Sequence, residues 1–307
     1  MICENKPLIS IALCTYNGEK YIEKQLDSLV SQSYTPIEIV ISDDSSTDGT
    51  WNILEKYAAV YPFIKLFKSR INLGFTKNFE QAISFCNGDF IALSDQDDIW
   101  DTDKLSILYN ELGDSDLIYH DSNFIDENDN PILGKKMSDH YNTYDGSSNL
   151  PFLISNCAAG HAMMFKKTLT QKFLPFKDGY YHDWWIIFVV ATFGKIKSIP
   201  DVLVRYRQHD LSITDSLSLK ATSTMDRNKG YLNFNLNWIE HCLTLPNIKN
   251  KEEIEIIYKQ LKSYKEGSRG MKLFIFLLHY YHLLFYFHIK NKSFISRLNL
   301  IRKISFG

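Results

Sequence analysis

The chain has 307 residues, of which 45% are hydrophobic and 23% charged, the composition of a globular protein with room for one large domain or for a domain plus an appendage. Its five cysteines are odd in number, widely spaced and free of Cys-x-x-Cys, which excludes a disulfide framework and a structural zinc site and favours a reducing cytosol. The formal net charge is −2, the N-terminus carries no secretion signal, and no nucleic-acid partner is expected.

Strand and helix patterns alternate four times in the first third of the chain. Apolar runs predict strands at 8–13, 37–42, 63–67 and 88–94, and helical periodicity predicts helices at 19–32, 50–58, 75–86 and 104–112. Short connections between alternating elements indicate an α/β fold with a mostly parallel, Rossmann-like sheet and helices on both faces.

Polar segments follow three of these strands, at 15–18, 43–47 and 95–98, and the carboxyl ends of parallel strands share one rim. The third segment holds Asp95, Asp97 and Asp98, whose negative charges repel unless a cation binds them. Mg²⁺ or Mn²⁺ is the expected cation, since both take carboxylate oxygens and share them with substrate phosphates. The alternative is capping of the next helix, although capping uses one carboxylate and not three.

The middle of the chain is less regular. We expect a strand at 117–119, a turn at 126–131, a polar loop at 134–150, a strand within 157–165, an aromatic helix at 181–193 and a last strand within 195–206. The turn has the acidic spacing of a calcium loop, but Pro131 and Met137 stand where such a loop needs Gly and Glu. Only helical patterns follow residue 212, so a boundary is placed there.

The C-terminal part is strongly basic. From Lys262 onward the chain contains nine Lys or Arg residues and one acidic residue, Glu266, which gives this part a charge of about +8. Within it, residues 273–289 contain no Lys, Arg, Asp or Glu but are too short and too polar to span a bilayer. They predict an interfacial helix on an anionic membrane, with packing on the chain's own domain or on a second subunit as alternatives.

With these motifs identified, residues 7–212 resemble the inverting nucleotide-sugar glycosyltransferases of family 2, which have the GT-A fold. The resemblance rests on Ser-Ile-Ala-Leu-Cys-Thr-Tyr-Asn-Gly at 10–18, Asp-Asp-Ser-Ser-Thr-Asp-Gly-Thr at 43–50 and Asp-Gln-Asp-Asp-Ile-Trp at 95–100. The last motif looks especially like that of bacterial rhamnosyltransferases of capsule and O-antigen assembly. It implies a catalytic domain at 1–212, with a nucleotide-sugar part at 1–120 and an acceptor part at 121–212, and an α-helical region at 213–307.

The resemblance also implies a donor site. Tyr16 would pack near the base, and Asp44, or Asp43 beside it, would accept the imide N–H of uracil or thymine. Asp95 would contact ribose or metal-bound water, and Asp97 would bind the metal, while the role of Asp98 stays open. Further donor contacts are implied for Thr15, Asn72, Gly74, Lys77 and Arg207, and His209 after the last strand is a further metal ligand.

For the chemistry, the resemblance implies a general base at the start of the aromatic helix, and Asp183 stands there. Relatives commonly have Glu-Asp at this place, whereas this chain has His182 before the aspartate. Residues expected to contact the acceptor are Trp100, Gly160, His161, Trp184 and Trp185.

The sequence therefore predicts a metal-dependent inverting glycosyltransferase using Mn²⁺ or Mg²⁺. Rhamnose from dTDP-rhamnose is the best expected donor sugar, with UDP-hexoses next, and a glycan or lipid-linked oligosaccharide is the acceptor. We expect a cytoplasmic enzyme, peripheral on the inner face of the membrane, with dimerisation through the C-terminal helices as an alternative. The other functions considered are a non-catalytic nucleotide-sugar-binding protein and a nucleotidyltransferase or phosphohydrolase.

Overall fold

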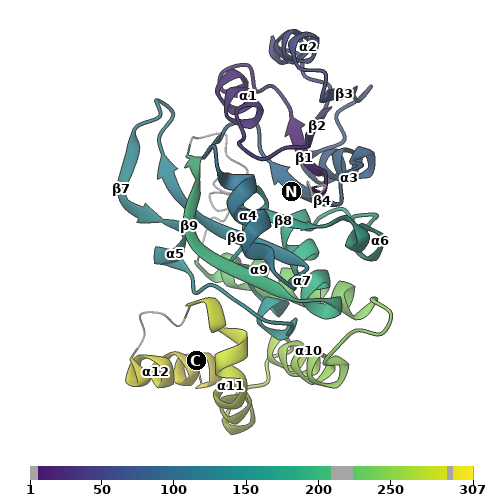
Figure 1. Cartoon of the computed structure of the whole chain (residues 1–307). Coiled ribbons are helices and arrows are strands. Elements are labelled where there is room, and N and C mark those ends of the chain that lie inside the picture. Colours follow the sequence, from purple (N-terminus) through teal and green to yellow (C-terminus); the bar gives the residue numbers. More distant parts are fainter. Residues whose placement is uncertain (1–5, 209–223, 289–292, 307) are drawn as a thin grey trace.

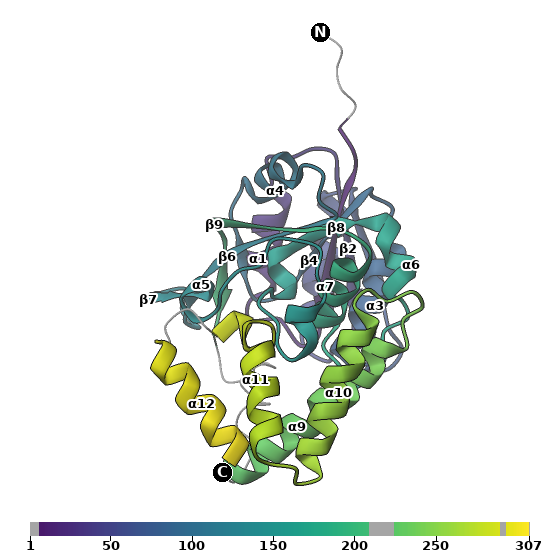
Figure 2. The ribbon, with the colours of Figure 1, turned by 90° about the horizontal axis from the view of Figure 1, so that it is seen from below.

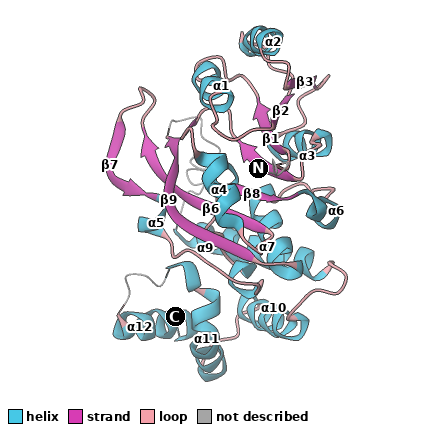
Figure 3. Cartoon of the chain, viewed as in Figure 1, coloured by secondary structure: helices cyan, strands magenta, loops and turns pink. Residues whose placement is uncertain are grey.

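The computed structural model describes residues 6–208, 224–288 and 293–306. A nine-stranded sheet forms the centre, with strand order β3-β2-β1-β4-β8-β6-β9-β5 and with β7 paired to β6 (Figures 1 and 3). The strands are β1 Ile9–Thr15, β2 Ile37–Asp43, β3 Ile64–Lys68, β4 Phe90–Ser94, β5 Ile99–Trp100, β6 Leu117–Ile125, β7 Pro131–Lys136, β8 Met163–Lys166 and β9 Ile196–Arg207.

Helices connect and flank these strands. The α-helices are α1 Ile22–Val30, α2 Thr50–Val60, α3 Phe75–Phe85, α4 Lys104–Leu112, α5 Met137–His140, α6 Thr170–Phe173, α7 His182–Phe193, α9 Thr224–Leu243, α10 Lys251–Lys265, α11 Met271–Leu284 and α12 Phe294–Phe306. Short 3₁₀ helices are η1 Leu150–Leu153, η2 Gly160–Ala162, η3 Lys167–Leu169 and η4 Tyr286–His288.

The N-terminal half of the sheet is parallel, as the sequence predicts. Strands β3, β2, β1 and β4 run side by side in one direction, so their carboxyl ends meet at one rim. Side chains alternate along β1: Ile11 and Leu13 face one core, and Ala12 and Cys14 face the other. A strand buried on both faces reads as a continuous apolar run, which is why its sequence pattern is clear.

The other half of the sheet is mixed, and its pairings place two residues beside the rim. Strand β8 runs antiparallel to β4 with Ala92 opposite Met164, and the 3₁₀ turn Gly160–Ala162 just before β8 brings His161 near Asp95. Strand β9 runs antiparallel to β5 with Ile99 opposite Arg205, which sets Arg207 beside Asp97.

Two cores lie on the two faces of the sheet. Apolar residues of α1, α2 and α4 form one core, and those of α3, α7 and the C-terminal helices form the other. Seen from below, α4 lies on one side of the sheet and α10, α11 and α12 gather on the opposite side (Figure 2). Almost every residue of α7 is buried, so this helix is a central support of its layer.

The C-terminal helices pack on the layer that contains α7. Buried residues of α11 (Leu273, Leu277, Tyr281 and Leu284) belong to the same core as α7. The helix ends at Leu284, earlier than the predicted 289, and the expected polar loop at 134–150 is instead partly β7 and α5. Within the described ranges, no helix is long and apolar enough to cross a membrane. The predicted boundary at 212 lies outside the described residues.

Candidate active site

Strands β1 and β2 end in a network of buried hydrogen bonds. Asp43 is fully buried, and its carboxylate accepts bonds from Thr15 Oγ1 at 2.9 Å, from Ser46 N at 3.0 Å and from Ser46 Oγ at 2.5 Å. Both oxygens of Asp43 accept hydrogen bonds within this segment, so Asp43 and Thr15 stabilise the loops at the ends of β1 and β2.

Asp44 connects the same turn to the segment before α3. Its two oxygens accept hydrogen bonds from the backbone N–H groups of Leu73, at 2.6 Å, and Gly74, at 2.9 Å. Gly74 has φ +82°, a conformation that favours glycine, and its N–H also reaches Asn72 Oδ1 at 3.1 Å. Three residues predicted to bind the nucleotide sugar, Asp44, Asn72 and Gly74, are therefore neighbours.

Lys77 lies apart from them. Its Nζ donates to Glu80 Oε2 at 2.9 Å and to the Phe176 carbonyl at 2.7 Å, so the ammonium is held against the α6–α7 connection. This differs from the expected phosphate contact. The reason is that two groups already bind the charge of Lys77: the Glu80 carboxylate, one helical turn away, and the Phe176 carbonyl, far along the chain.

Tyr16 stands on the rim with 45% of its surface exposed. The Gln96 side chain ties its backbone to the acidic loop, since Oε1 accepts from Tyr16 N at 2.8 Å and Nε2 donates to Tyr16 O at 3.0 Å. This fixes the first loop against residues 95–98 and leaves the tyrosine ring at the surface, where a base could pack.

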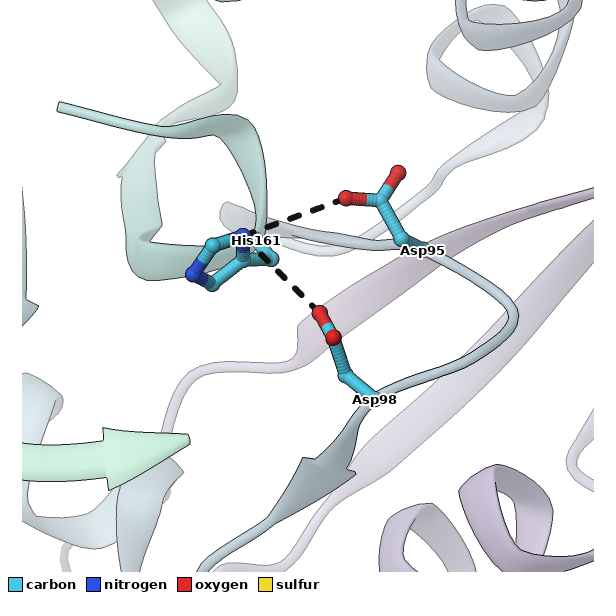
Figure 4. A group of neighbouring side chains, drawn as sticks. All are labelled: Asp95, Asp98 and His161. Atoms are coloured by element: carbon cyan, nitrogen blue, oxygen red, sulfur yellow. Dashed lines mark ion pairs between the residues drawn. The ribbon is translucent and has the colours of Figure 1, made fainter. Parts of the chain in front are cut away.

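The acidic loop contributes to a cluster of Asp95, Asp98 and His161 (Figure 4). Each residue offers one ligand atom, and these atoms all lie within 4.8 Å of one another. His161 Nδ1 is 3.9 Å from Asp95 Oδ2 and 3.8 Å from Asp98 Oδ2. Asp98 is fully buried, yet its Oδ2 has no hydrogen-bond partner among the described residues. A buried carboxylate oxygen in this state is costly, and a cation at this point would satisfy it.

His161 is prepared to be a ligand. Its ring stacks on Tyr206 with centroids 4.4 Å apart, and its Nε2 lies 2.9 Å from Ser122 Oγ. Burial, and then the nearby Lys104 charge, lower the pKa of His161 to about 3, so the imidazole is neutral at neutral pH. With the proton on Nε2, donated to Ser122, Nδ1 presents its lone pair to the two carboxylates, as in metal-binding histidines.

Negative charge collects here, and the nearby Lys104 offsets only part of it. Burial raises the pKa of Asp98 well above its usual value, and repulsion from Asp97 and Asp95 adds to the shift. Partial enclosure likewise raises the pKa of Asp95 to about 7, with repulsion from Asp97 and Asp183. Oxygen and imidazole ligands around such charge suit Mn²⁺ or Mg²⁺, so the residues present fit a divalent ion.

A buried lysine lies behind the cluster, and the sequence analysis missed it. Lys104, the first residue of α4, is fully buried; its Nζ donates to the His161 carbonyl at 2.6 Å and lies 3.2 Å from the centre of the Trp100 ring. Trp100 is only 4% exposed, so it supports this lysine inside the core and does not line an acceptor surface as expected. At sequence level, a lysine in the first turn of a helix gives no sign of burial.

Asp183 is the second residue of α7 and lies close to Gly160, the residue before His161. Its Oδ1 accepts a hydrogen bond from Trp184 N at 2.7 Å. Burial raises the pKa of Asp183 to about 6, while hydrogen bonds from the Trp184 and Gly160 backbones partly lower it. The bond from Gly160, the residue before His161, holds the Asp183 carboxylate beside the segment that carries His161. A Cβ at Gly160 would lie 3.2 Å from His182 Nε2, so the close approach of the two segments favours glycine there.

Trp184 and Trp185 do not reach this space. Their indole N–H groups donate to the carbonyls of Phe152, at 2.7 Å, and Phe173, at 3.0 Å, and both rings pack against Trp238 of α9. They are 8% and 5% exposed, which corrects the expectation that they stack on sugars. The apolar surface of α9 covers them, and the sequence could not reveal that contact.

Two more residues are expected at the site from the end of the last strand: Arg207 as a contact of the nucleotide sugar and His209 as a metal ligand. Arg207 is 1% exposed, and its side chain is engaged with the acidic loop and the β6–β7 turn rather than open at the rim. His209 lies outside the described residues. The histidine that the fold does bring to the carboxylates is His161, which the sequence placed in the acceptor pocket.

A parallel half-sheet with an acidic cluster after its fourth strand defines an α/β enzyme of the GT-A type, as comparison with known proteins bears out. The chain belongs to the family described as glycosyl transferase family 2, whose model matches residues 10–173. It is 31% identical over 242 residues to the dTDP-rhamnosyl transferase RfbG of Shigella flexneri, an alignment that covers 71% of this chain and 80% of that protein. A cholesterol galactosyltransferase of Borreliella burgdorferi is 31% identical over 116 residues, covering 37% of this chain and 32% of that protein.

Solved structures show the same fold. Residues 1–349 of S. aureus TarS in complex with UDP-GlcNAc superpose with a TM-score of 0.59 and 17% identity, covering 98% of this chain and 82% of that one. The mannosyltransferase PcManGT from Pyrobaculum calidifontis, in complex with GDP-Man and Mn²⁺, gives a TM-score of 0.53 and 15% identity over 86% of this chain and 84% of that one. At these identities the likeness establishes the GT-A fold alone.

Proposed function

We propose that the protein is a metal-dependent inverting glycosyltransferase that moves a sugar from a nucleoside diphosphate to an acceptor hydroxyl. The observation that carries this proposal is that Asp183 is bonded to Gly160, directly next to His161 of the Asp95–Asp98–His161 cluster. Transfer with inversion needs a base on one side of the anomeric carbon and charge neutralisation on the other, and these two groups supply both.

Asp183 is the proposed base. With a pKa of about 6 it is ionised at neutral pH yet more basic than an ordinary aspartate. It takes the proton of the acceptor hydroxyl as that oxygen attacks the anomeric carbon, and the bond from this carbon to the diphosphate oxygen breaks. A bound Mn²⁺ or Mg²⁺, held by Asp95, Asp98 and His161, would neutralise charge on the departing diphosphate. Asp97, beside them, keeps its proposed place as a further metal contact.

For the donor, dTDP-rhamnose is the best candidate and a UDP-hexose the second. The support is the likeness to RfbG, named a dTDP-rhamnosyl transferase, and the fold shared with TarS, solved with UDP-GlcNAc. The exposed Tyr16 and the Asp44–Gly74 connection would bind the base, because each Asp44 oxygen keeps a second lone pair for an imide N–H. The proposed acceptor is a glycan or lipid-linked oligosaccharide of bacterial surface polysaccharide.

A cytoplasmic enzyme acting on such an acceptor would benefit from contact with the inner face of the membrane. We call the exposed apolar side chains of the last two helices the α11–α12 patch: Met271, Ile275, Leu278, Phe294, Ile295 and Phe306. Exposed Arg269, Lys272, Arg302 and Lys303 neighbour it in sequence, and their charge complements anionic lipid. A second copy of the chain is the other candidate occupant.

The test uses purified protein, a set of nucleotide sugars and Mn²⁺. We expect Mn²⁺-dependent hydrolysis or transfer with one donor, and we expect Asp183→Asn to lower transfer by at least about a thousandfold while donor affinity stays within about threefold. Unchanged transfer by Asp183→Asn would remove Asp183 from the mechanism. Donor binding with no turnover in the wild type would favour a non-catalytic sugar-nucleotide binder.

A further inference from the structure

Arg207 is a cation almost completely enclosed by protein. It ends β9, and only 1% of it is exposed. Its backbone N–H donates to Asp98 Oδ1 at 3.0 Å, and its Nε donates to the Asp97 carbonyl at 2.7 Å. One residue therefore holds both the carboxylate of Asp98 and the main chain of the acidic loop.

The other end of the guanidinium holds the turn between β6 and β7. Nη1 donates to the Asp126 carbonyl at 2.9 Å, and Nη2 forms an ion pair with Asp129 Oδ1 at 2.6 Å. Nε and Nη1 thus donate hydrogen bonds to backbone carbonyls, Nη2 is in ion-pair contact with Asp129, and the ring of Tyr21 lies 4.6 Å from the guanidinium carbon. An arginine fork used in this way has little freedom to follow a substrate diphosphate.

The β6–β7 turn also forms ion pairs with Lys20 and with Lys24 of α1. Lys24 of α1 pairs with Asp129, and Lys20 pairs with Glu127 at 2.7 Å. Asp126 closes the turn by accepting bonds from Asn128 N and Asn130 N at 2.8 and 2.9 Å. The acidic loop is thereby connected, through Arg207, to a frame built on α1.

These bonds to Arg207 oppose the electrostatic repulsion within the acidic loop. Neighbouring carboxylates repel one another, and a loop that carries them would open whenever no cation is bound. A buried guanidinium that bonds the loop main chain opposes this opening and leaves Asp98 Oδ2 directed at His161. Outer partners of this kind commonly tune metal affinity through the ligands they orient.

We propose that Arg207 is a positioning residue that keeps the Asp97–Asp98 segment in the shape that receives a divalent ion, and that Asp129 on the β6–β7 turn is part of this support. The inference rests on the proposed metal site and differs from a role of Arg207 as a diphosphate ligand. It assigns a metal-binding contribution to Asp129, whose carboxylate contacts Arg207 and Lys24 and is not one of the three clustered ligands.

The experiment measures Mn²⁺ affinity of the full chain without nucleotide, by electron paramagnetic resonance of free Mn²⁺. The variants are Arg207→Lys and Asp129→Asn, and the matched control is Asp114→Asn, which removes a surface ion pair with Lys195. We expect Mn²⁺ affinity to fall about tenfold to a hundredfold in Arg207→Lys and about threefold to tenfold in Asp129→Asn, with Asp114→Asn unchanged. Nucleotide affinity measured in EDTA should stay equal in all four proteins.

Asp129→Asn keeps the test valid if Arg207→Lys fails to fold, because Asp129 is on a turn with 24% of its side chain exposed. Equal Mn²⁺ affinity in Asp129→Asn and the control, or a loss of nucleotide affinity in EDTA in Arg207→Lys, would overturn the inference alone. A wild type that binds no Mn²⁺ would overturn the metal site and the inference together.

Discussion

As the proposed general base, Asp183 must satisfy two opposing demands. A general base works best with a pKa near the working pH, and the burial that raises the pKa of Asp183 to about 6 makes its ionised form less stable in the folded protein. The site thus stores a small electrostatic cost that the rest of the fold offsets.

A pH prediction follows for the rate. Protonated Asp183 cannot accept the acceptor proton, so kcat/KM should fall about tenfold per pH unit below about 6 and level off above it. The profile is measured with Mn²⁺ held saturating at each pH. A profile flat from pH 5 to 8 would contradict Asp183 as the base.

The same shift predicts a stability effect of opposite direction. Because the folded pKa lies above the unfolded one, the stability that the protonated form gives is lost as pH rises from about 4 through about 6. Asp183→Asn should therefore match the wild type near pH 4 and be more stable by about 1 kcal/mol at pH 8, after allowance for partial exposure. Urea unfolding in EDTA at the two pH values measures the difference.

At the scale of elements, α7 positions the proposed base, Asp183. Its two indoles bond the carbonyls of Phe152 and Phe173, which fixes the first turn of the helix and so the direction of Asp183. Helix α9 supports this turn from behind through Trp238. The tryptophans are structural in this arrangement.

Replacing Trp184 by Phe tests that conclusion. The change removes one hydrogen bond and leaves a small cavity, so the free energy of unfolding should fall by about 1–3 kcal/mol, with little change in acceptor KM. Denaturant unfolding and initial rates give both numbers, and Trp51→Phe on the partly exposed face of α2 is the matched control. A raised acceptor KM at unchanged stability would return Trp184 to the sugar-binding surface.

At the scale of the whole molecule, the C-terminal helices have two different faces. One face of α11 is buried in the core it shares with α7, which agrees with the alternative of packing on the chain's own domain. The opposite face carries part of the α11–α12 patch, so an interfacial role stays a proposal for that face alone.

Vesicle binding tests the patch. The wild type should sediment with vesicles containing anionic lipid and not with purely zwitterionic ones, since apolar area and basic charge act together. Phe294→Ser with Ile295→Ser should weaken binding at least about tenfold, while Ile256→Ser, an exposed apolar residue of α10, should not. If the double variant instead converts a dimer to a monomer without changing vesicle binding, a second subunit is the occupant.

Local patterns were enough to predict much of the donor half. The apolar runs of β1, β2 and β4 and the polar segments after them follow from neighbouring residues, and parallel strands necessarily deliver their ends to one rim. Thus Asp44, Asp95 and Asp183 could be selected as candidate site residues from the sequence and its resemblance to family 2, and their roles stay predictions.

Contacts between distant segments decided the rest. The pairing of β8 with β4 moved His161 from a supposed acceptor pocket to the carboxylates, and the pairing of β9 with β5 turned Arg207 inward. Burial of other side chains also depends on distant partners. Lys104, which lies against Trp100, bonds the His161 carbonyl. Trp184 and Trp185 pack against Trp238 of another helix. A sequence determines which segments are strands and helices through short-range periodicity, whereas strand register and side-chain burial depend on long-range packing, which only the tertiary structure specifies.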